Sequence, residues 1–458
     1  MNSFCLVPLR VLTRPTLSCN QLDFLPGEES RKNPNLTPTG RLQARYHRWG
    51  RCASMNLDSE MEERVESVFI VSGARTPIGK FGGSLAGMTA ADLGVIAAKA
   101  AVERAGIPAD RVEETIFGNA RQAGGGPNVA RQIRHRSGVP DSSPAYTVNK
   151  ACASGMKSIV LGYQEILLGN ADCVLAGGTE AMSRVPYLVE NARWGMRLGH
   201  QTLADAMYRD GFLDPLSQMV MGETAEKLAG LHNISREEQD CFALSSQLRA
   251  EAATKEGCFR DEIVPIEVKD KGGTRKIEAD EHIRFGSTVE AMAKLPAVFS
   301  KSGTVTAGNS SGITDGAAAA ILVSGRKVKE WGLKPLGRIV DYSTTGVDPS
   351  IMGIAPVPAT RKLLGKLAWK LQDFDLIELN EAFAAQVLAC DRELHFDRDK
   401  LNVNGGAIAL GHPIGCSGTR IVVTLLHAMR RRGAARGLAT LCVSGGLGMA
   451  VALEAASG

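Results

Sequence analysis

The sequence has few aromatic residues, no long apolar run and almost no net charge in most of its length. Aromatic residues make up 5% of the 458 residues. No run of about 18 apolar residues occurs, so we expect no membrane span. The formal net charge is +4, but residues 1–57 hold eight Lys/Arg and three Asp/Glu, which leaves 45 basic and 46 acidic residues in the remainder. A neutral body argues against nucleic acid as a partner.

The ten cysteines show no CxxC pair and no zinc spacing. A chain of this length buries a large core and does not need a disulfide framework. We therefore expect a reducing compartment and no metal site.

Residues 1–57 differ from the rest of the chain. They contain no acidic residue before Asp23, and Arg10 and Arg14 are basic. Two interpretations are open: a mitochondrial transit peptide, or sequence upstream of a true start at Met55. Five prolines argue against one amphipathic helix. We favour the second interpretation, which predicts a disordered extension on a cytoplasmic protein, with the mitochondrial matrix as the alternative.

From residue 66 onward, strand patterns alternate with helix patterns. A buried strand is predicted in SVFIVSGARTPIG, and a helix in MTAADLGVIAAKAAVERAG, with Thr89 near its start and Gly106 just after its end. A later stretch, ADCVLAGGTEAM, predicts a strand that leads into a glycine turn. This alternation indicates parallel βαβ units.

The C-terminal part repeats this plan. A strand and a helix are predicted in DFDLIELNEAFAAQVLACDREL, and paired strands in GLATLCVSGGLGMAVALE. The pairs VN at 148–149 and GG at 177–178 recur as VN at 403–404 and GG at 445–446. A duplication and a chance recurrence of glycine turns both remain open. The more polar region 183–312 predicts an inserted loop domain over one face.

Four side chains with useful chemistry fall at the ends of predicted strands. Cys152 in NKACASGMKS precedes a helix whose N-terminus favours a thiolate, and its small neighbours leave room for an acyl group. His412, between glycine and proline, lies on a constrained turn where an imidazole can accept a thiol proton. Cys442 precedes a glycine turn, and Asn380 lies where a strand meets a helix. Each residue alone has an ordinary structural explanation, but open α/β sheets bind ligands at this edge.

The motifs together resemble those of the thiolase family over residues 66–455. In chain order they are SGARTPIGKFGGSL, NKACASGMKS, GGTEAMS, GNSSGITDGAAA, LNEAFAAQ, NVNGGAIALGHPIGCSGTR and CVSGGLGMA. The resemblance implies an α/β fold in which two duplicated βαβαβ-type halves form a layered α/β/α/β/α core with an inserted loop domain. The corresponding predicted boundaries are an N-terminal half of 66–182 plus 313–335, a loop domain of 183–312 and a C-terminal half of 336–458.

The resemblance also implies a Claisen condensation of acetyl-CoA within lipid metabolism. Cys152 would carry the acetyl group, and His412 would activate its thiol. Cys442 would remove a proton from the methyl group of a second acetyl-CoA. Asn380 would hold a water that, with His412, stabilises the enolate oxygen, and the N–H groups of Cys152 and Ser444 would stabilise the tetrahedral oxyanion. No metal or redox cofactor is implied, because coenzyme A thioesters are the substrates.

The same resemblance assigns the residues that bind coenzyme A. Arg284 would lie near the adenine end and Ser311 near the pantetheine. Met221 and Met352 would line the pantetheine channel, and Phe383 the acyl pocket. Acyl-CoA is then the small-molecule partner, and a homodimer or homotetramer is the expected assembly.

Two departures from the family pattern leave alternatives open. Ser444 stands where a CxGGG motif has glycine, so its Cβ puts the turn donor in question. Val220 stands where acetoacetyl-CoA-type relatives have a polar residue such as histidine. The first expectation is condensation of two acetyl-CoA to acetoacetyl-CoA and CoA, and the alternative is a broad-chain 3-ketoacyl-CoA thiolase of fatty-acid β-oxidation.

Three further hypotheses follow from the same residues. A non-catalytic acyl-CoA or sterol binder would lack one of the four catalytic residues, whereas all four are present. A decarboxylating ketosynthase would pair its cysteine with two histidines or with a histidine and an asparagine, whereas this chain has Cys442 at the final strand. A reversible Cys152–Cys442 disulfide that switches activity off is also predicted. The absence of this cross-link from peptide maps of peroxide-treated protein would remove that hypothesis.

Overall fold

The computed structural model describes residues 66–270 and 273–456, so the predicted disordered extension lies outside the described residues. Its main feature is a ten-stranded sheet with the order β12-β13-β14-β11-β1-β10-β5-β3-β4, in which β2 pairs with β10. The strands are β1 (Val68–Arg75), β2 (Gly79–Lys80), β3 (Glu114–Gly118), β4 (Ala145–Val148), β5 (Cys173–Ala181), β10 (Thr314–Ser324), β11 (Gly337–Gly346), β12 (Leu376–Leu379), β13 (Arg436–Val443) and β14 (Leu447–Ala455).

Helices cover the outer faces of the two halves of this sheet, and two further helices pack between the halves. The helices are α2 (Ala90–Ala105), α3 (Val129–Arg136), α4 (Ser154–Leu167), α8 (Gly325–Glu330), α9 (Pro356–Leu367), α10 (Ala384–Leu394), α11 (Ala407–Leu410) and α12 (Ile414–Arg432). The prediction for α2 is confirmed in detail, because Thr89 caps its first turn and Gly106 ends it in the left-handed conformation. Among the helices of residues 66–270 and 273–456, none combines the length and the apolar character needed to cross a bilayer.

The two halves of the sheet have the same strand order and the same strand directions. In the N-terminal half, β1, β10 and β5 pair antiparallel, and β5, β3 and β4 pair parallel. In the C-terminal half, β11, β14 and β13 pair antiparallel, and β13 and β12 pair parallel. A parallel bridge from Ile377 to Leu401 takes the place of β4. This shared topology supports the duplication that the short sequence matches left open.

The register of the strands shows which of the two sequence matches, VN or GG, occupies equivalent positions in the two halves. Ile116 pairs with Tyr146 and Ile377 with Leu401, so Asn149 and Asn404 occupy equivalent positions. The glycine pairs are not equivalent, and the predicted turn at 177–178 is wrong. Both of these glycines lie inside β5. Glycine is needed at both positions because a Cβ on Gly177 would overlap the ring of Phe117 and one on Gly178 would overlap the backbone of Gly415. The second pair, Gly445–Gly446, does lie in a turn, between β13 and β14.

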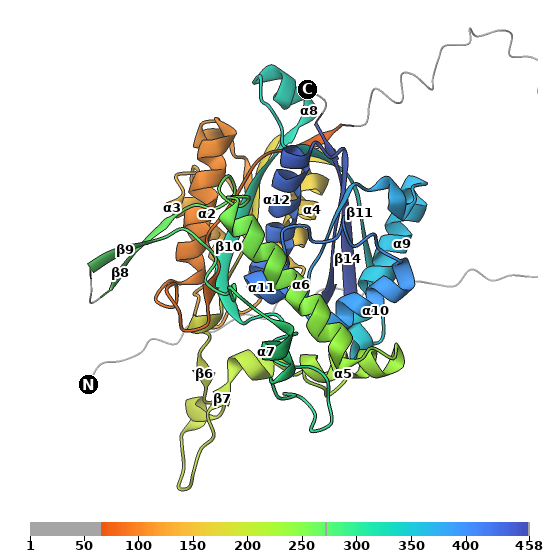
Figure 1. The fold of residues 1–458 in the computed structure, drawn as a ribbon. Helices are drawn as coiled ribbons and strands as arrows, with labels where there is room; N and C mark the ends of the chain where they lie inside the picture. The colour runs from red at the N-terminus through yellow and green to blue at the C-terminus, as the bar shows by residue number, and fades with distance from the viewer. Residues whose placement is uncertain (1–65, 271–272, 457–458) are drawn as a thin grey trace, which may run out of the picture. The chain divides into compact units, whose positions relative to one another are not determined.

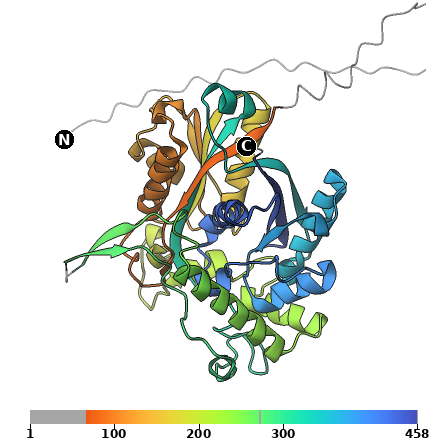
Figure 2. The ribbon, with the colours of Figure 1, turned by 45° about the horizontal axis from the view of Figure 1, so that its top comes forward.

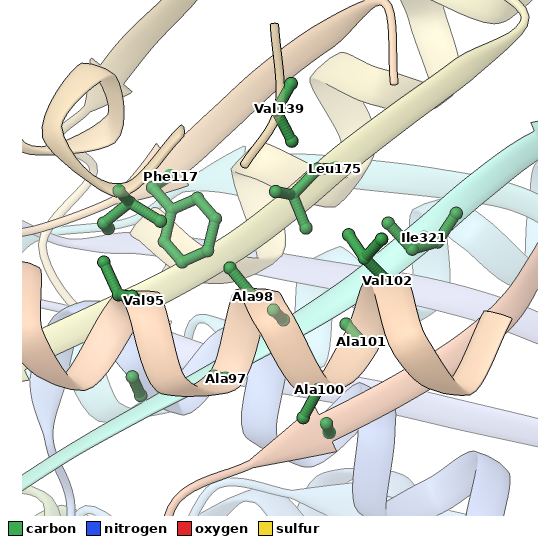
Figure 3. Close-up of a cluster of buried hydrophobic side chains, with 14 of the residues drawn as sticks. Val95, Ala97, Ala98, Ala100, Ala101, Val102, Phe117, Val139, Leu175 and Ile321 are labelled. Carbon is green, nitrogen blue, oxygen red and sulfur yellow. The ribbon is translucent and has the colours of Figure 1, made fainter. Parts of the chain in front are cut away.

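Three buried cores produce the layered architecture. One core joins α2 and α3 to the outer face of the N-terminal half, and Figure 3 shows Val95, Ala98 and Val102 on the side of α2 that faces Phe117, Leu175 and Ile321. A second core surrounds α4 and α12 between the two halves, and Figure 2 looks along α12 in that position. A third core joins α9 and α10 to the outer face of the C-terminal half (Figure 1). The predicted α/β/α/β/α order is confirmed.

The region between β5 and β10 contains α5 (Met221–Leu231), α6 (Arg236–Lys255), α7 (Val289–Ala293) and the hairpins β6 (Tyr187–Leu188) with β7 (Ala204–Asp205) and β8 (Ile266–Asp270) with β9 (Gly273–Ile277). A buried ion cluster attaches this region to β1. Arg75 donates from Nε to Glu262 over 2.6 Å and from Nη1 to Asp280 over 2.7 Å. Since removing one partner of a buried ion pair leaves an uncompensated charge, loss of either carboxylate would destabilise this attachment.

Candidate active site

A single cavity of about 670 Å³ collects residues from distant segments of the chain. This volume lies within the usual range for small-molecule and cofactor sites. Nine of the ten residues predicted to bind coenzyme A or to take part in catalysis line it, namely Met221, Arg284, Ser311, Met352, Phe383, Cys152, His412, Cys442 and Ser444. Only Asn380 does not. The convergence expected from the motifs is therefore a feature of the fold.

Cys152 is held by a strained turn between β4 and α4. Ala151 has a φ of 43°, which is uncommon for a residue with a Cβ. The turn is stabilised by Asn149 Oδ1, which accepts from Ala151 N over 3.0 Å. Ser154 Oγ accepts from Lys150 N over 2.8 Å and donates to Ala151 O over 2.7 Å. Cys152 thus lies directly ahead of α4, as the sequence predicted.

The surroundings of the Cys152 sulfur favour the neutral thiol at rest. Burial raises its pKa, and the N–H groups of Ser444 and of Cys152 itself, which hydrogen-bond to the sulfur, oppose this effect only in part. These hydrogen bonds favour the thiolate, as expected at a helix N-terminus, but burial outweighs them in the resting protein. Cys152 consequently needs a base, and the oxyanion role of the two N–H groups stays a prediction.

His412 is the candidate for that base, since it lines the same cavity. It is 8% exposed and lies between α11 and α12, where its own N–H donates to Gly312 O over 3.0 Å. Burial, with the charges of Arg420 and Arg121, lowers its pKa to about 3. The ring is therefore neutral at physiological pH and able to accept a proton.

Ser417 determines which ring nitrogen of His412 is free. The hydroxyl of Ser417 donates to Pro413 O over 3.0 Å and lies 2.5 Å from His412 Nδ1. Because the hydroxyl proton is already used, Nδ1 is the donor in the shorter contact and Nε2 carries the lone pair. Nε2 has no partner among the described residues. No role was predicted for Ser417 from the sequence, although it lies within the motif NVNGGAIALGHPIGCSGTR.

We expect Ser417→Ala to lower kcat for thiolysis about tenfold, since one hydrogen bond of typical strength no longer selects the tautomer. KM should change less than about twofold, because Ser417 does not line the cavity. Ser417→Thr retains the hydroxyl and should restore most of the rate. Steady-state kinetics of the three proteins are the measurement. A loss confined to KM, or one that Ser417→Thr fails to restore, would contradict this role.

Cys442 and Ser444 lie at the end of β13 and in the turn after it. Cys442 is 1% exposed, and burial, followed by the nearby Cys152 and Cys390, raises its pKa. Gly445 and Gly446 have φ values of 83° and 79°, whereas Ser444 is not among the residues of positive φ. The two glycines therefore provide the left-handed turn. The Cβ of Ser444 meets no left-handed strain, so serine is compatible with the donor position.

Asn380 is fully buried beside the cavity. It extends the pairing of β12 through its N–H, which donates to Thr440 O over 3.0 Å. Neither polar atom of its side chain has a partner among the described residues. Buried amides are nearly always hydrogen-bonded, which fits the water-holding role, and that role stays a prediction.

Residues 66–270 and 273–456 contain no cluster of three or more His, Cys, Asp or Glu suited to a metal ion.

The remaining predicted residues lie along the cavity wall. Arg284 donates from Nη2 to Ala307 O over 3.1 Å, and Phe383 packs edge-to-face on Phe299 with ring centroids 6.3 Å apart. Met221 begins α5 directly after Val220, which also lines the cavity. Their proposed contacts with coenzyme A remain predictions.

Glu180 and Arg121 are two residues of the site that the sequence did not reveal. Glu180 accepts from Asn119 Nδ2 over 2.7 Å and from the N–H groups of Ala120, Arg121 and Gly415 over 3.1, 3.0 and 2.9 Å. It thereby joins the end of β3 to the first turn of α12. Arg121 lines the cavity. The only sequence signal was the glutamate of the GGTEAMS motif.

Comparison with known families and proteins agrees with this geometry. The family model described as "Thiolase, N-terminal domain" matches residues 68–326, and "Thiolase, C-terminal domain" matches residues 333–455. The acetyl-CoA acetyltransferase of Chromobacterium violaceum is 52% identical over 388 residues, which cover 84% of this chain and 99% of that protein. The enzyme of the same name from Pseudomonas aeruginosa is 52% identical over 390 residues, with coverages of 85% and 99%.

Solved structures show the same similarity in three dimensions. Human mitochondrial 3-ketoacyl-CoA thiolase has a TM-score of 0.84 and 48% identity, covering 86% of this chain and all of that one (100%). The Bacillus anthracis acetyl-CoA acetyltransferase has a TM-score of 0.84 and 47% identity, with coverages of 86% and 99%.

Proposed function

Because this chain belongs to the thiolase family, we propose that it condenses two acetyl-CoA to acetoacetyl-CoA and free CoA, and catalyses the reverse thiolysis, through an acyl group on Cys152. The observation that carries the proposal is the meeting of Cys152, His412, Cys442 and Ser444 in one cavity. The relatives named acetyl-CoA acetyltransferase support the reaction.

In the first half-reaction, His412 Nε2 takes the proton of the Cys152 thiol, and the sulfur attacks the carbonyl carbon of acetyl-CoA. The tetrahedral oxyanion accepts hydrogen bonds from the N–H groups of Cys152 and Ser444. CoA leaves as a thiolate that then takes the proton of Cys442, and the acetyl group remains on Cys152 while His412 keeps the proton that it accepted. Covalent capture divides one difficult step into two easier ones.

In the second half-reaction, the thiolate of Cys442 removes a proton from the methyl group of another acetyl-CoA. The α-proton of a thioester is weakly acidic, so the enolate requires fixed donors. His412 and a water held by Asn380 would supply them. The carbanion attacks the acetyl group on Cys152, the new carbon–carbon bond forms, and the Cys152 sulfur leaves and recovers its proton from His412. No step requires a metal or redox cofactor, since coenzyme A carries both acyl groups.

The assembly and the compartment belong to the same proposal. The hairpin of β6 and β7 exposes the large apolar side chains of Trp194, Met196, Leu198 and Leu203. Apolar residues gathered on one projection favour contact with another copy of the chain, so we expect a homodimer or a homotetramer. The seven cysteines of the described residues are all free, which supports a reducing compartment, the cytoplasm first and the mitochondrial matrix as the alternative.

The range of acyl chains tests the proposed function. We expect acetoacetyl-CoA to be cleaved with a higher kcat/KM than 3-oxodecanoyl-CoA. The alternative, a broad-chain 3-ketoacyl-CoA thiolase, is favoured by one observation, the apolar Val220 on the cavity wall. Thiolysis assays with acyl chains of four to ten carbons distinguish the two activities. A preference for the ten-carbon substrate would overturn the first choice.

A further inference from the structure

The charged side chains that line the cavity are all positive. Its lining residues include two arginines, Arg121 and Arg284, and no aspartate or glutamate. Arg284 belongs to the part of the wall predicted to meet the adenine end of coenzyme A. Arg121 has no part in the mechanism proposed above, yet it lines the same cavity as Cys152 and His412.

Glu180 is the acidic residue near Arg121, but no ion pair or hydrogen bond joins the two side chains. The guanidinium of Arg121 donates no hydrogen bond and makes no ion pair with any described residue, and its Nε is buried without a partner. Glu180 is near enough for Arg121 to lower its pKa. However, the hydrogen bonds to Glu180 come from the main chain and from Asn119, not from this guanidinium. The oxygens of Glu180 are thus hydrogen-bonded to other groups, which leaves Arg121 Nε without an acceptor among the described residues.

The surroundings of Arg121 hold its guanidinium in place. It packs so closely on Gly211 that a Cβ there would collide with Nη2, Nε and Cζ. Apolar side chains line the adjoining wall, including Tyr208, Phe212 and Ile414. The positive charge of Arg121 opposes the effect of burial on the pKa of Cys152 and adds to the effect of burial on the pKa of His412, which indicates that Arg121 lies near the reacting groups. A cation among apolar groups is unfavourable unless a counter-charge joins it.

We propose that this cavity accepts 3-oxoacyl-CoA substrates whose acyl chain ends in a carboxylate, and that Arg121 binds this carboxylate. The planar fork of a guanidinium matches the two oxygens of a carboxylate, and such charge-assisted hydrogen bonds are strong. The inference rests on the proposed thiolase function and adds a class of substrate to the same site. A dicarboxylic substrate supplies the missing negative charge.

The reaction follows the thiolytic direction with the terminal carboxylate unchanged. Cys152 gives its proton to His412, and the sulfur bonds to the 3-oxo carbon. The bond between C2 and C3 breaks, its electron pair takes the proton of Cys442, and acetyl-CoA leaves. The thiol proton of a second CoA restores Cys442, and this CoA attacks the acyl group. Cys152 leaves and recovers its proton from His412, so the products are acetyl-CoA and a shorter ω-carboxyacyl-CoA.

The experiment compares two matched pairs of substrates in the full-length protein. The six-carbon pair is 3-oxoadipyl-CoA and 3-oxohexanoyl-CoA, and the eight-carbon pair is 3-oxosuberyl-CoA and 3-oxooctanoyl-CoA. In the wild type we expect the ratio of kcat/KM, carboxylated over neutral, to be about tenfold or more for at least one pair. Arg121→Met should bring this ratio below one, and Arg121→Lys should give an intermediate value.

Two further variants separate binding of the carboxylate from damage to the fold. Gly211→Ala displaces the guanidinium without removing its charge and should also lower the ratio. Arg430→Met removes an exposed arginine of α12 outside this cavity and should retain the wild-type ratio. The ratio compares two substrates on one protein, so a partly unfolded fraction cancels.

Thiolysis of acetoacetyl-CoA by each protein distinguishes the possible failures. If the wild type cleaves acetoacetyl-CoA but prefers neither carboxylated substrate, the inference is overturned and the proposed function stands. A preference that survives Arg121→Met would overturn the assignment to Arg121. If the wild type cleaves no 3-oxoacyl-CoA, the proposed function and this inference fail together.

Discussion

Cys152→Ala is expected to lower kcat for acetoacetyl-CoA thiolysis by about 10⁴-fold or more, the usual scale for loss of a covalent nucleophile. The sulfur is the only atom in the proposal that carries the acyl group, so no partial route remains. Intact-mass spectrometry after incubation with acetyl-CoA should show one added acetyl group on the wild type and none on the variant. Steady-state thiolysis provides the rate.

The control for this experiment is Cys241→Ala, which removes an exposed cysteine outside the cavity and should leave mass labelling and rate unchanged. Binding of CoA to Cys152→Ala, measured by calorimetry, should remain within a few-fold of the wild type, because the other wall residues are present. An acetyl group that appears on Cys152→Ala, or a loss below tenfold, would refute the assignment of the nucleophile.

Cys442→Ser is expected to separate the two half-reactions. A serine hydroxyl is a far weaker acid than a thiol, so the variant cannot exchange the α-proton at a useful rate, and acetoacetyl-CoA formation should fall by about 10³-fold. Acetylation of Cys152 should persist, since His412 and the N–H groups of Cys152 and Ser444 are unchanged. Intact mass reports the acetylation, and incorporation of deuterium from solvent into the methyl group of acetyl-CoA reports proton exchange.

A second buried cysteine serves as the matched control for this variant. Cys390 lies in α10, does not line the cavity, and donates from Sγ to Gly353 O over 3.3 Å. A serine there can make the same hydrogen bond, so Cys390→Ser should retain both half-reactions. If Cys442→Ser lost acetylation as completely as condensation, or kept deuterium incorporation, Cys442 would not be the acid and base at carbon.

The local elements were predictable because their signals lie within a few residues of each other. Thr89 and Gly106 mark the ends of α2 by capping, and apolar spacing marks the buried strands. The glycines at 177–178 show the limit of such reasoning. Glycine is typical of turns, but here it allows the approach of Phe117 and Gly415 to β5, contacts that are set by packing.

The candidate site was predictable only in part. The motifs pointed to Cys152, His412 and Cys442, and the cavity brings all three together. Ser417 and Arg121 were not predictable, because a hydrogen bond to an imidazole ring and an arginine without a partner leave no pattern in a sequence. The net rise in the pKa of Cys152 was also missed, since burial is a property of the folded chain.

From its residues alone this chain is assigned an α/β class, its element boundaries and the set of reactive groups, because propensity, capping and motif order act over short stretches. Folding added which of those groups share a cavity, which nitrogen of His412 is free, and that Arg121 faces the cavity without an ion pair to any described residue. These properties depend on desolvation and on contacts between segments up to hundreds of residues apart. Such contacts exist only when the two halves of the sheet close around α4 and α12.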